Sequence, residues 1–260
     1  MKTALCLSGH MRTYKDTSEG LIKNIIEPLN CDVYIHTWDI RDHTPHGYYE
    51  DKKDDDFSKI KELLNPKKMV VENQEKVTKN IIRPTIQKHA LRGAFHNKPE
   101  GVLCMYYKKQ KVFELVEEQG VDYDMIITTR PDILCGKSNV SDSSPLSYED
   151  FDLNVINLPP ADGMAINCEK HIPSGKLIGG YGSFGGCADI FAAGNKENIK
   201  NYSAVYNNIV SYTQLGCPLQ AERLLMQHLF KNELKVREVN ALFGILRDID
   251  HNEWLKNENR

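Results

Sequence analysis

The chain of 260 residues is 40% hydrophobic, which is enough for a substantial buried core. Its net charge of -3 offers no basic field of the kind that draws proteins to nucleic acid, so we expect no nucleic-acid partner. The seven cysteines are an odd number without a CxxC pair, and no apolar run approaches the length of a membrane span. These features predict a cytoplasmic protein without a transmembrane segment.

The first half of the chain alternates apolar runs with segments of helical spacing. Strands are predicted over 3–7, 31–36 and 68–72, and a further strand from Met125. Helices are predicted over 18–26, 57–64 and 101–119, and a polar loop over 41–56. Strands that alternate with helices pair in parallel through right-handed crossovers, so their carboxyl ends meet at one edge of the sheet.

The second half of the chain is less regular. Strands are predicted over 153–158, 187–193 and 234–239, and helices over 196–212 and 218–231. A polar, glycine-rich loop over 161–186 is long for a compact domain, and such loops are usually functional. Because no Pro/Ser/Gly-rich linker divides the chain, we predict one α/β domain over 1–260, with a mostly parallel, Rossmann-like sheet flanked by helices.

The apolar run that begins at Met125 ends abruptly in Arg130-Pro131-Asp132. It predicts a buried strand that delivers one fixed cation and one carboxylate to the edge where open parallel sheets bind ligands. The alternative is that Arg130 pairs with Asp132 and merely fastens the end of the strand.

Two other segments follow predicted strands at the same edge. Ser8-Gly9-His10-Met11-Arg12 offers backbone N–H groups to a phosphate or a base: Gly9 permits close approach, and Arg12 is a forked donor. It lacks the Walker A lysine and the GxGxxG spacing, which disfavours a P-loop ATPase or a dinucleotide dehydrogenase. The alternative is a glycine turn with a solvated arginine.

Trp38 and Asp39 close the second strand. In one interpretation the indole stacks on a nucleotide base and the carboxylate accepts from a ribose hydroxyl. In the other, Trp38 is a core residue and Asp39 caps a helix or a turn.

Three segments carry a resemblance to a known family. They read Ser-Gly-x-x-Arg over 8–12, Cys-Asp-Val-Tyr-Ile-His-Thr-Trp-Asp over 31–39, and Tyr-Asp-x-Ile-Ile-x-x-Arg-Pro-Asp-Ile over 123–133. They resemble a group of glycosyltransferases from bacterial polysaccharide loci and large DNA viruses. The order of elements is similar to the GT-A fold, in which an Asp-x-Asp motif after the fourth strand holds a divalent cation against the donor's diphosphate. The resemblance implies polysaccharide biosynthesis, with a nucleotide-binding half over 1–136 and an acceptor-binding half over 137–260.

The chain departs from this family pattern because Arg130-Pro131-Asp132 stands where Asp-x-Asp would be. A departing diphosphate is stabilised either by a metal held on carboxylates or by an arginine placed on the phosphate oxygens. Asp132 can still bind a hard cation such as Mn or Mg through oxygen, so metal binding stays open. The resemblance also implies a late histidine near the metal or the diphosphate, and His251 is that residue in this chain. The alternative is that His251 belongs to a solvated tail.

Two carboxylates are candidates for the general base that takes the acceptor's proton. Glu222 is similar to the acidic residue that opens a late GT-A helix and acts as the base, although a glutamate there is also favoured by the helix dipole. Asp189 is the rival, with a hydrogen bond at a strand start as its structural alternative. In the loop before it, Tyr181 and Phe184 are candidates to stack on an acceptor sugar, and Asp162 is a weaker third carboxylate.

We therefore expect a glycosyltransferase that moves a sugar from a nucleotide-diphosphate-sugar donor to a glycan hydroxyl. A sugar-1-phosphate nucleotidyltransferase is the first alternative, because such enzymes share a related sheet and also place Gly and Arg after the first strand. Their glycine-rich signature is longer than the segment over 8–12. A non-catalytic nucleotide- or glycan-binding module is the second alternative.

Overall fold

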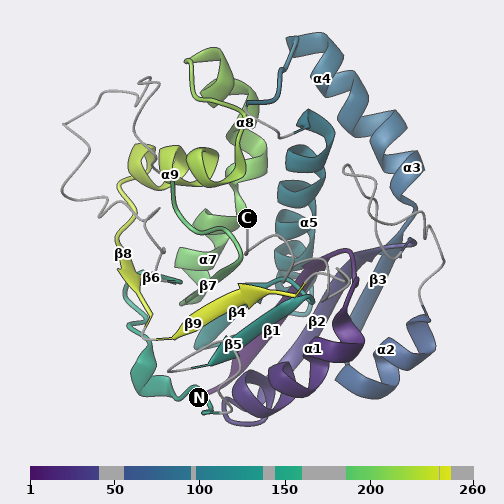
Figure 1. Ribbon diagram of the computed structural model, residues 1–260. Helices are drawn as coiled ribbons and strands as arrows, with labels where there is room; N and C mark the ends of the chain where they lie inside the picture. Colours follow the sequence, from purple (N-terminus) through teal and green to yellow (C-terminus); the bar gives the residue numbers. More distant parts are fainter. Residues whose placement is uncertain (41–55, 95–97, 137–143, 160–185, 240, 247–260) are drawn as a thin grey trace, which may run out of the picture.

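The computed structural model describes residues 1–40, 56–94, 98–136, 144–159, 186–239 and 241–246. Within these residues, seven strands form one sheet in the order β3-β2-β1-β4-β7-β6-β8 (Figure 1). The first four in the chain are mutually parallel: β1 (Thr3–Gly9), β2 (Cys31–Trp38), β3 (Lys68–Glu72) and β4 (Met125–Thr129). Next to β4, β7 (Phe191–Gly194) runs antiparallel, and β6 (Ile156–Leu158) and β8 (Val236–Glu238) complete the sheet. The predicted α/β architecture with a mostly parallel sheet is confirmed.

The central strands are apolar on both faces because helices cover the sheet on both sides. In β1, Leu5 and Leu7 belong to one core cluster, while Ala4 and Cys6 belong to the other. This alternation follows from the period of two in a strand. It also explains why the central strands read as continuous apolar runs in the sequence.

One face of the sheet is covered by α1 (Tyr14–Leu21), its π-helical continuation η1 (Ile22–Ile26) and α2 (Phe57–Leu64) (Figure 1). The other face carries α5 (Pro99–Glu117), α7 (Lys196–Ser203), α8 (Val205–Gln214) and α9 (Ala221–Lys231). Among the described helices, none is both long and apolar enough to cross a bilayer.

Several helix boundaries differ from the prediction. The first helix begins at Tyr14 rather than at residue 18, and the single helix expected over 196–212 is interrupted at Ala204. The connection after β3, for which no helix was predicted, contains α3 (Gln74–Val77), η2 (Thr78–Ile82) and α4 (Arg83–His89). Their apolar positions are sparse, and it is contact with the core around α5 that buries Val77 and Ile82.

A small second sheet was not predicted. In it, β5 (Ile133–Gly136) pairs antiparallel with β9 (Leu242–Ile245). The next residue, Leu246, donates its backbone N–H to the carbonyl of Asp132 at 2.9 Å and accepts from the hydroxyl of Thr13 at 2.8 Å. This sheet therefore brings a late segment of the chain to the ends of β1 and β4.

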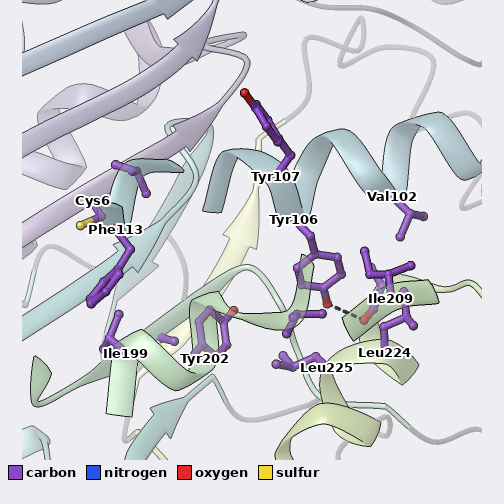
Figure 2. Close-up of a cluster of buried hydrophobic side chains, with 14 of the residues drawn as sticks. Cys6, Val102, Tyr106, Tyr107, Phe113, Ile199, Tyr202, Ile209, Leu224 and Leu225 are labelled. Carbon is purple, nitrogen blue, oxygen red and sulfur yellow. Dashed lines mark hydrogen bonds between the residues drawn. The ribbon is translucent and has the colours of Figure 1, made fainter. Parts of the chain in front are cut away.

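The core between α5 and the late helices contains one polar contact that positions α9. Figure 2 shows Tyr106 of α5 pointing toward α9, where its hydroxyl donates to the carbonyl of Ala221 at 2.6 Å. Tyr106 is fully buried among apolar side chains such as Leu224 and Leu225. Because a buried hydroxyl is costly without a partner, this bond fixes the first turn of α9, which carries Glu222.

Candidate active site at the carboxyl edge of the sheet

The switch point of the sheet lies between β1 and β4, because the chain leaves β1 toward β2 on one side and returns to β4 on the other. Open α/β sheets bind ligands at such points. Arg12 follows β1, and Arg130 and Asp132 follow β4. The sequence analysis placed the three residues at this edge, and the structure shows that their side chains meet: Arg130 donates from Nε and Nη2 to the two oxygens of Asp132 at 2.7 Å each, and Arg12 Nη1 donates at 3.1 Å.

In this ion network the carboxylate is buried and the two cations are partly exposed. Asp132 is 1% exposed, whereas the side chains of Arg12 and Arg130 are each 17% exposed. Burial by itself raises the pKa of Asp132, but attraction and hydrogen bonds from Arg130, and then from Arg12, outweigh it and lower the pKa to about 2. The contact does fasten the strand end, as the structural alternative held, but it also ties the ends of two strands together.

We expect the ionised Asp132 to contribute to stability at neutral pH and to lose this contribution in acid. Its pKa of about 2 in the folded chain lies below the ordinary value of 3.8, a difference worth roughly 2 kcal/mol. The contribution is complete above about pH 4 and disappears as the pH falls toward 2. The free energy of unfolding in urea should therefore fall more steeply between pH 5 and pH 3 in the wild type than in Asp132→Asn. Equal slopes in the two proteins would contradict this.

The turn after β1 holds Arg12 in an uncommon backbone conformation. Arg12 has a φ of +46°, in the left-handed region that residues with a side chain rarely adopt. The turn is fixed from both sides: Met11 is fully buried, and Thr17 of α1 donates to the carbonyl of Pro131 at 2.6 Å. Such strain often marks a functional position, and here it belongs to the arginine that reaches Asp132.

A divalent cation does not fit the Asp132 carboxylate in this arrangement. Both of its oxygens already accept from guanidinium groups, so a metal bound there would have two positive neighbours. Within the described residues, no group of three or more His, Cys, Asp or Glu side chains is placed to hold a metal. His251, the second predicted ligand, lies outside the described residues.

The two rival base candidates lie at the same edge. Because β7 is antiparallel to β4, its amino end is next to the carboxyl end of β4, where Thr129 donates to the carbonyl of Ile190 at 2.9 Å. Asp189 directly precedes Ile190, and Glu222 in α9 is close enough for the charge of Asp189 to raise its pKa. Sequence reasoning treated them as alternatives, but the fold makes them neighbours.

Lys109 of α5 is a site residue that sequence reasoning missed. It is 4% exposed, and its Nζ contacts both the carbonyl and the carboxylate of Asp189, the latter at 3.4 Å, and the hydroxyl of Tyr202 at 3.3 Å. Burial lowers the pKa of Lys109; Asp189 opposes this, and the charge of Arg130 adds to it. The only signal in the sequence was a lysine within the apolar pattern of a long helix.

The surroundings of Glu222 differ from those of a carboxylate that only complements a helix dipole. Its pKa is raised, first by burial and second by Asp189, with Lys109 opposing. A carboxylate that only complemented the helix dipole would have a lowered pKa. Its backbone is closely packed: the carbonyl accepts from the N–H of Cys187 at 3.1 Å, and a Cβ on Gly186 would lie 2.6 Å from the Cβ of Glu222.

At the end of β2, the two predicted nucleotide-binding residues, Trp38 and Asp39, make contacts within the protein. Trp38 is 1% exposed; the ammonium of Lys108 lies 3.7 Å from its ring centre, and the ring of Tyr107 is stacked against it. Asp39 accepts from the backbone N–H of Gln74 at 2.9 Å and from the side chain of Asn73, at the start of α3. This geometry favours the core and capping alternatives.

The remaining residues of the first turn are mostly buried. Ser8 and His10 are 6% and 7% exposed, and His10 Nε2 is hydrogen-bonded to the side-chain oxygen of Gln74 at 2.8 Å. Gly9 has a φ of +104°, which a residue with a side chain adopts only under strain. The shape of the turn thus depends on Gly9. Arg12 is the residue of this turn that reaches the ion network.

A second buried lysine lies beside this turn. Lys108 is 0% exposed and contacts His36 Nδ1 at 3.0 Å and Glu72 Oε2 at 2.9 Å. Burial lowers the pKa of Lys108 to about 8, and burial together with Lys108 lowers the pKa of His36 to about 3. His36 is therefore neutral at physiological pH, and we assign this group a structural role.

Three predicted acceptor-site residues, Asp162, Tyr181 and Phe184, lie outside the described residues. A surface pocket of about 510 Å³ beside α4 and the start of α5 contains none of the predicted site residues. Comparison with known proteins adds nothing to the site: no protein-family model matches the chain, and no curated protein matches it.

Proposed function

We propose that the protein is a glycosyltransferase of the GT-A type that transfers a sugar from a nucleotide-diphosphate-sugar donor to a hydroxyl group of a glycan. Two observations at one edge of the sheet carry this proposal: Arg12 and Arg130 meet on Asp132, and Glu222 beside Asp189 has a raised pKa. An inverting transfer of a sugar from a diphosphate needs a cationic group for the leaving diphosphate and a base for the incoming hydroxyl.

The proposed roles follow from position and charge. Arg12 and Arg130 face the diphosphate at the switch point, and Asp132 holds their guanidinium groups. In an inverting transfer, the acceptor oxygen bonds to the anomeric carbon as the bond from that carbon to the diphosphate oxygen breaks. Glu222 takes the proton of the acceptor hydroxyl, and the nucleoside diphosphate leaves with the bonding electron pair. Asp189 supports Glu222 because a neighbouring negative charge increases its affinity for a proton.

Two further features support the GT-A assignment. Arg130-Pro131-Asp132 follows the fourth parallel strand, the position that the resemblance gives to the donor's diphosphate. Glu222 lies in the first turn of α9, where the resemblance places an acidic residue that acts as general base.

A donor screen tests this function. We expect one class of nucleotide sugar to raise the melting temperature of the protein, since a ligand that binds only the folded state stabilises it. Incubation of that donor with glycan acceptors should then release the nucleoside diphosphate. Release of pyrophosphate from a nucleoside triphosphate and a sugar phosphate would instead indicate a nucleotidyltransferase. Donor binding without turnover across all acceptors would indicate a binding module.

A further inference from the structure

We propose that Lys109 is a positioning residue of the proposed transfer: it anchors Asp189 beside Glu222 and so holds the two carboxylates together as one site. The inference rests on the proposed function for the role of Glu222 as the base. The arrangement of the three residues stands on the contacts between α5, the start of β7 and the first turn of α9.

Two residues on one face of α5 hold the chain next to the two carboxylates. Tyr106 and Lys109 are three positions apart, so their side chains leave the helix on the same side. The hydroxyl of Tyr106 donates to the carbonyl of Ala221, the residue before Glu222, at 2.6 Å (Figure 2). The Nζ of Lys109 donates to the carbonyl of Asp189 and lies 3.4 Å from its carboxylate. One helix therefore fixes both segments.

The two segments are also joined to each other. The backbone N–H of Cys187, two residues before Asp189, donates to the carbonyl of Glu222 at 3.1 Å. The hydroxyl of Tyr202 in α7 donates to the carbonyl of Asp189 at 3.2 Å, and it accepts from Lys109 at 3.3 Å. Asp189 therefore cannot move away from the first turn of α9 without losing its contact with Lys109.

The charge of Lys109 compensates two like charges that would otherwise repel each other. The side chains of Lys109 and Asp189 are 5% and 10% exposed, so their charges are poorly screened by water. Burial and then Asp189 raise the pKa of Glu222, and Lys109 opposes them. Burial lowers the pKa of Lys109, Asp189 opposes this, and Arg130 at the end of β4 adds to it. The two tyrosine hydroxyls stay neutral, because burial raises their pKa values well above the ordinary 10.

Carbon-13 NMR of the glutamate side-chain carboxyl groups tests the inference without a substrate. The signal of Glu222 is the one that Glu222→Gln lacks. In Lys109→Met, Glu222 should titrate at a higher pH than in the wild type, because the cation that favours its ionised form is gone. Lys109→Arg keeps the charge, and Glu222 should titrate there as in the wild type. Lys111→Met is the matched control, because Lys111 is an exposed lysine on the same helix, and it should leave the titration unchanged.

Kinetics with the nucleotide sugar that the donor screen identifies tests the effect on transfer. At a pH where Glu222 is fully ionised, Lys109→Met should lower kcat about 10–100-fold, the cost of a misplaced reacting group. The KM for the donor should stay unchanged, because Lys109 acts on the base and not on donor binding. Lys109→Arg should recover most of the lost rate, which a role in packing alone does not predict.

The inference is overturned if Glu222 titrates at the same pH in Lys109→Met and in the wild type. Circular dichroism shows whether Lys109→Met folds. If it does not, the same change is made in Asp189→Asn, where the buried carboxylate is already absent. Glu222 should then titrate at a higher pH in the double variant than in Asp189→Asn, and equal titrations would overturn the inference.

The two proposals can fail separately. If the wild type transfers sugar and Lys109→Met keeps the wild-type kcat, the role of Lys109 is wrong and the proposed function stands. If Lys109→Met shifts the titration of Glu222 but no donor is turned over by the wild type, the arrangement of the three residues is confirmed and the proposed function fails.

Discussion

Glu222→Gln should lower the rate of sugar transfer by about 10²–10⁴-fold, the range expected when a general base is removed. Glutamine has nearly the same shape but cannot accept the proton of the acceptor hydroxyl. Donor binding should be unchanged, because Glu222 belongs to α9 and not to the arginine network. Initial rates of nucleoside diphosphate release measure the first effect, and calorimetry with the donor measures the second.

The pH dependence of the wild type gives an independent check on Glu222. The base acts only when it is ionised, and its pKa lies above the ordinary 4.5 because of burial and the charge of Asp189. The rate should therefore fall as the pH is lowered, with a midpoint above 4.5. Glu197→Gln is the matched control, since Glu197 also lies in the first turn of a helix but is exposed. Wild-type turnover in Glu222→Gln would remove Glu222 as the base and leave Asp189 as the candidate.

Lys109→Met should lower the free energy of unfolding by about 3–5 kcal/mol, the typical cost of removing one partner of a buried ion pair. Methionine fills a similar volume, so the loss comes mainly from Asp189, which would remain buried without its counter-charge. Urea unfolding followed by circular dichroism measures the effect.

A second substitution separates charge from packing at this position. Lys109→Met combined with Asp189→Asn should recover part of the lost stability, because removing both charges also removes the cost of burying one alone. Lys111→Met on the same helix is the control: its partner Glu114 is about as exposed as Lys111 itself, and the change should cost less than about 1 kcal/mol. If Lys109→Met lowers the free energy of unfolding no more than Lys111→Met does, the buried pair of Lys109 and Asp189 does not contribute to stability.

The strands of the parallel half could be predicted because each is a short apolar run, and β1 and β4 are buried on both faces. The run from Met125 and the segment from Lys68 to Glu72 leave little choice of conformation, and α2 is bounded by Asp56 and a left-handed Asn65. The helices after β3 could not be predicted in this way, since their apolar residues are too few to show a period. Their stability comes from packing against α5. The pairing of β5 with β9 joins four-residue segments far apart in the chain, which no local pattern encodes.

The site was predictable only where topology alone brings residues together. Arg12, Arg130 and Asp132 follow strands whose carboxyl ends must be neighbours in a parallel sheet, so their meeting could be expected. The proximity of Asp189 to Glu222 depends on the antiparallel direction of β7, which the sequence does not reveal. Lys109 was missed because its partner is 80 positions away and lies on a different element.

The pairing of β9 with β5 has a consequence for the order in which the protein matures during translation. Ribosomes deliver the amino-terminal part first, so β1 to β4 can associate long before residues 242–246 have left the exit tunnel. The backbone bond from Leu246 to Asp132 can form only after residues 242–246 have been synthesised. A nascent chain can therefore pair β1 to β4 well before the second sheet fixes the backbone of Asp132, so the parallel strands assemble before this edge of the sheet is complete.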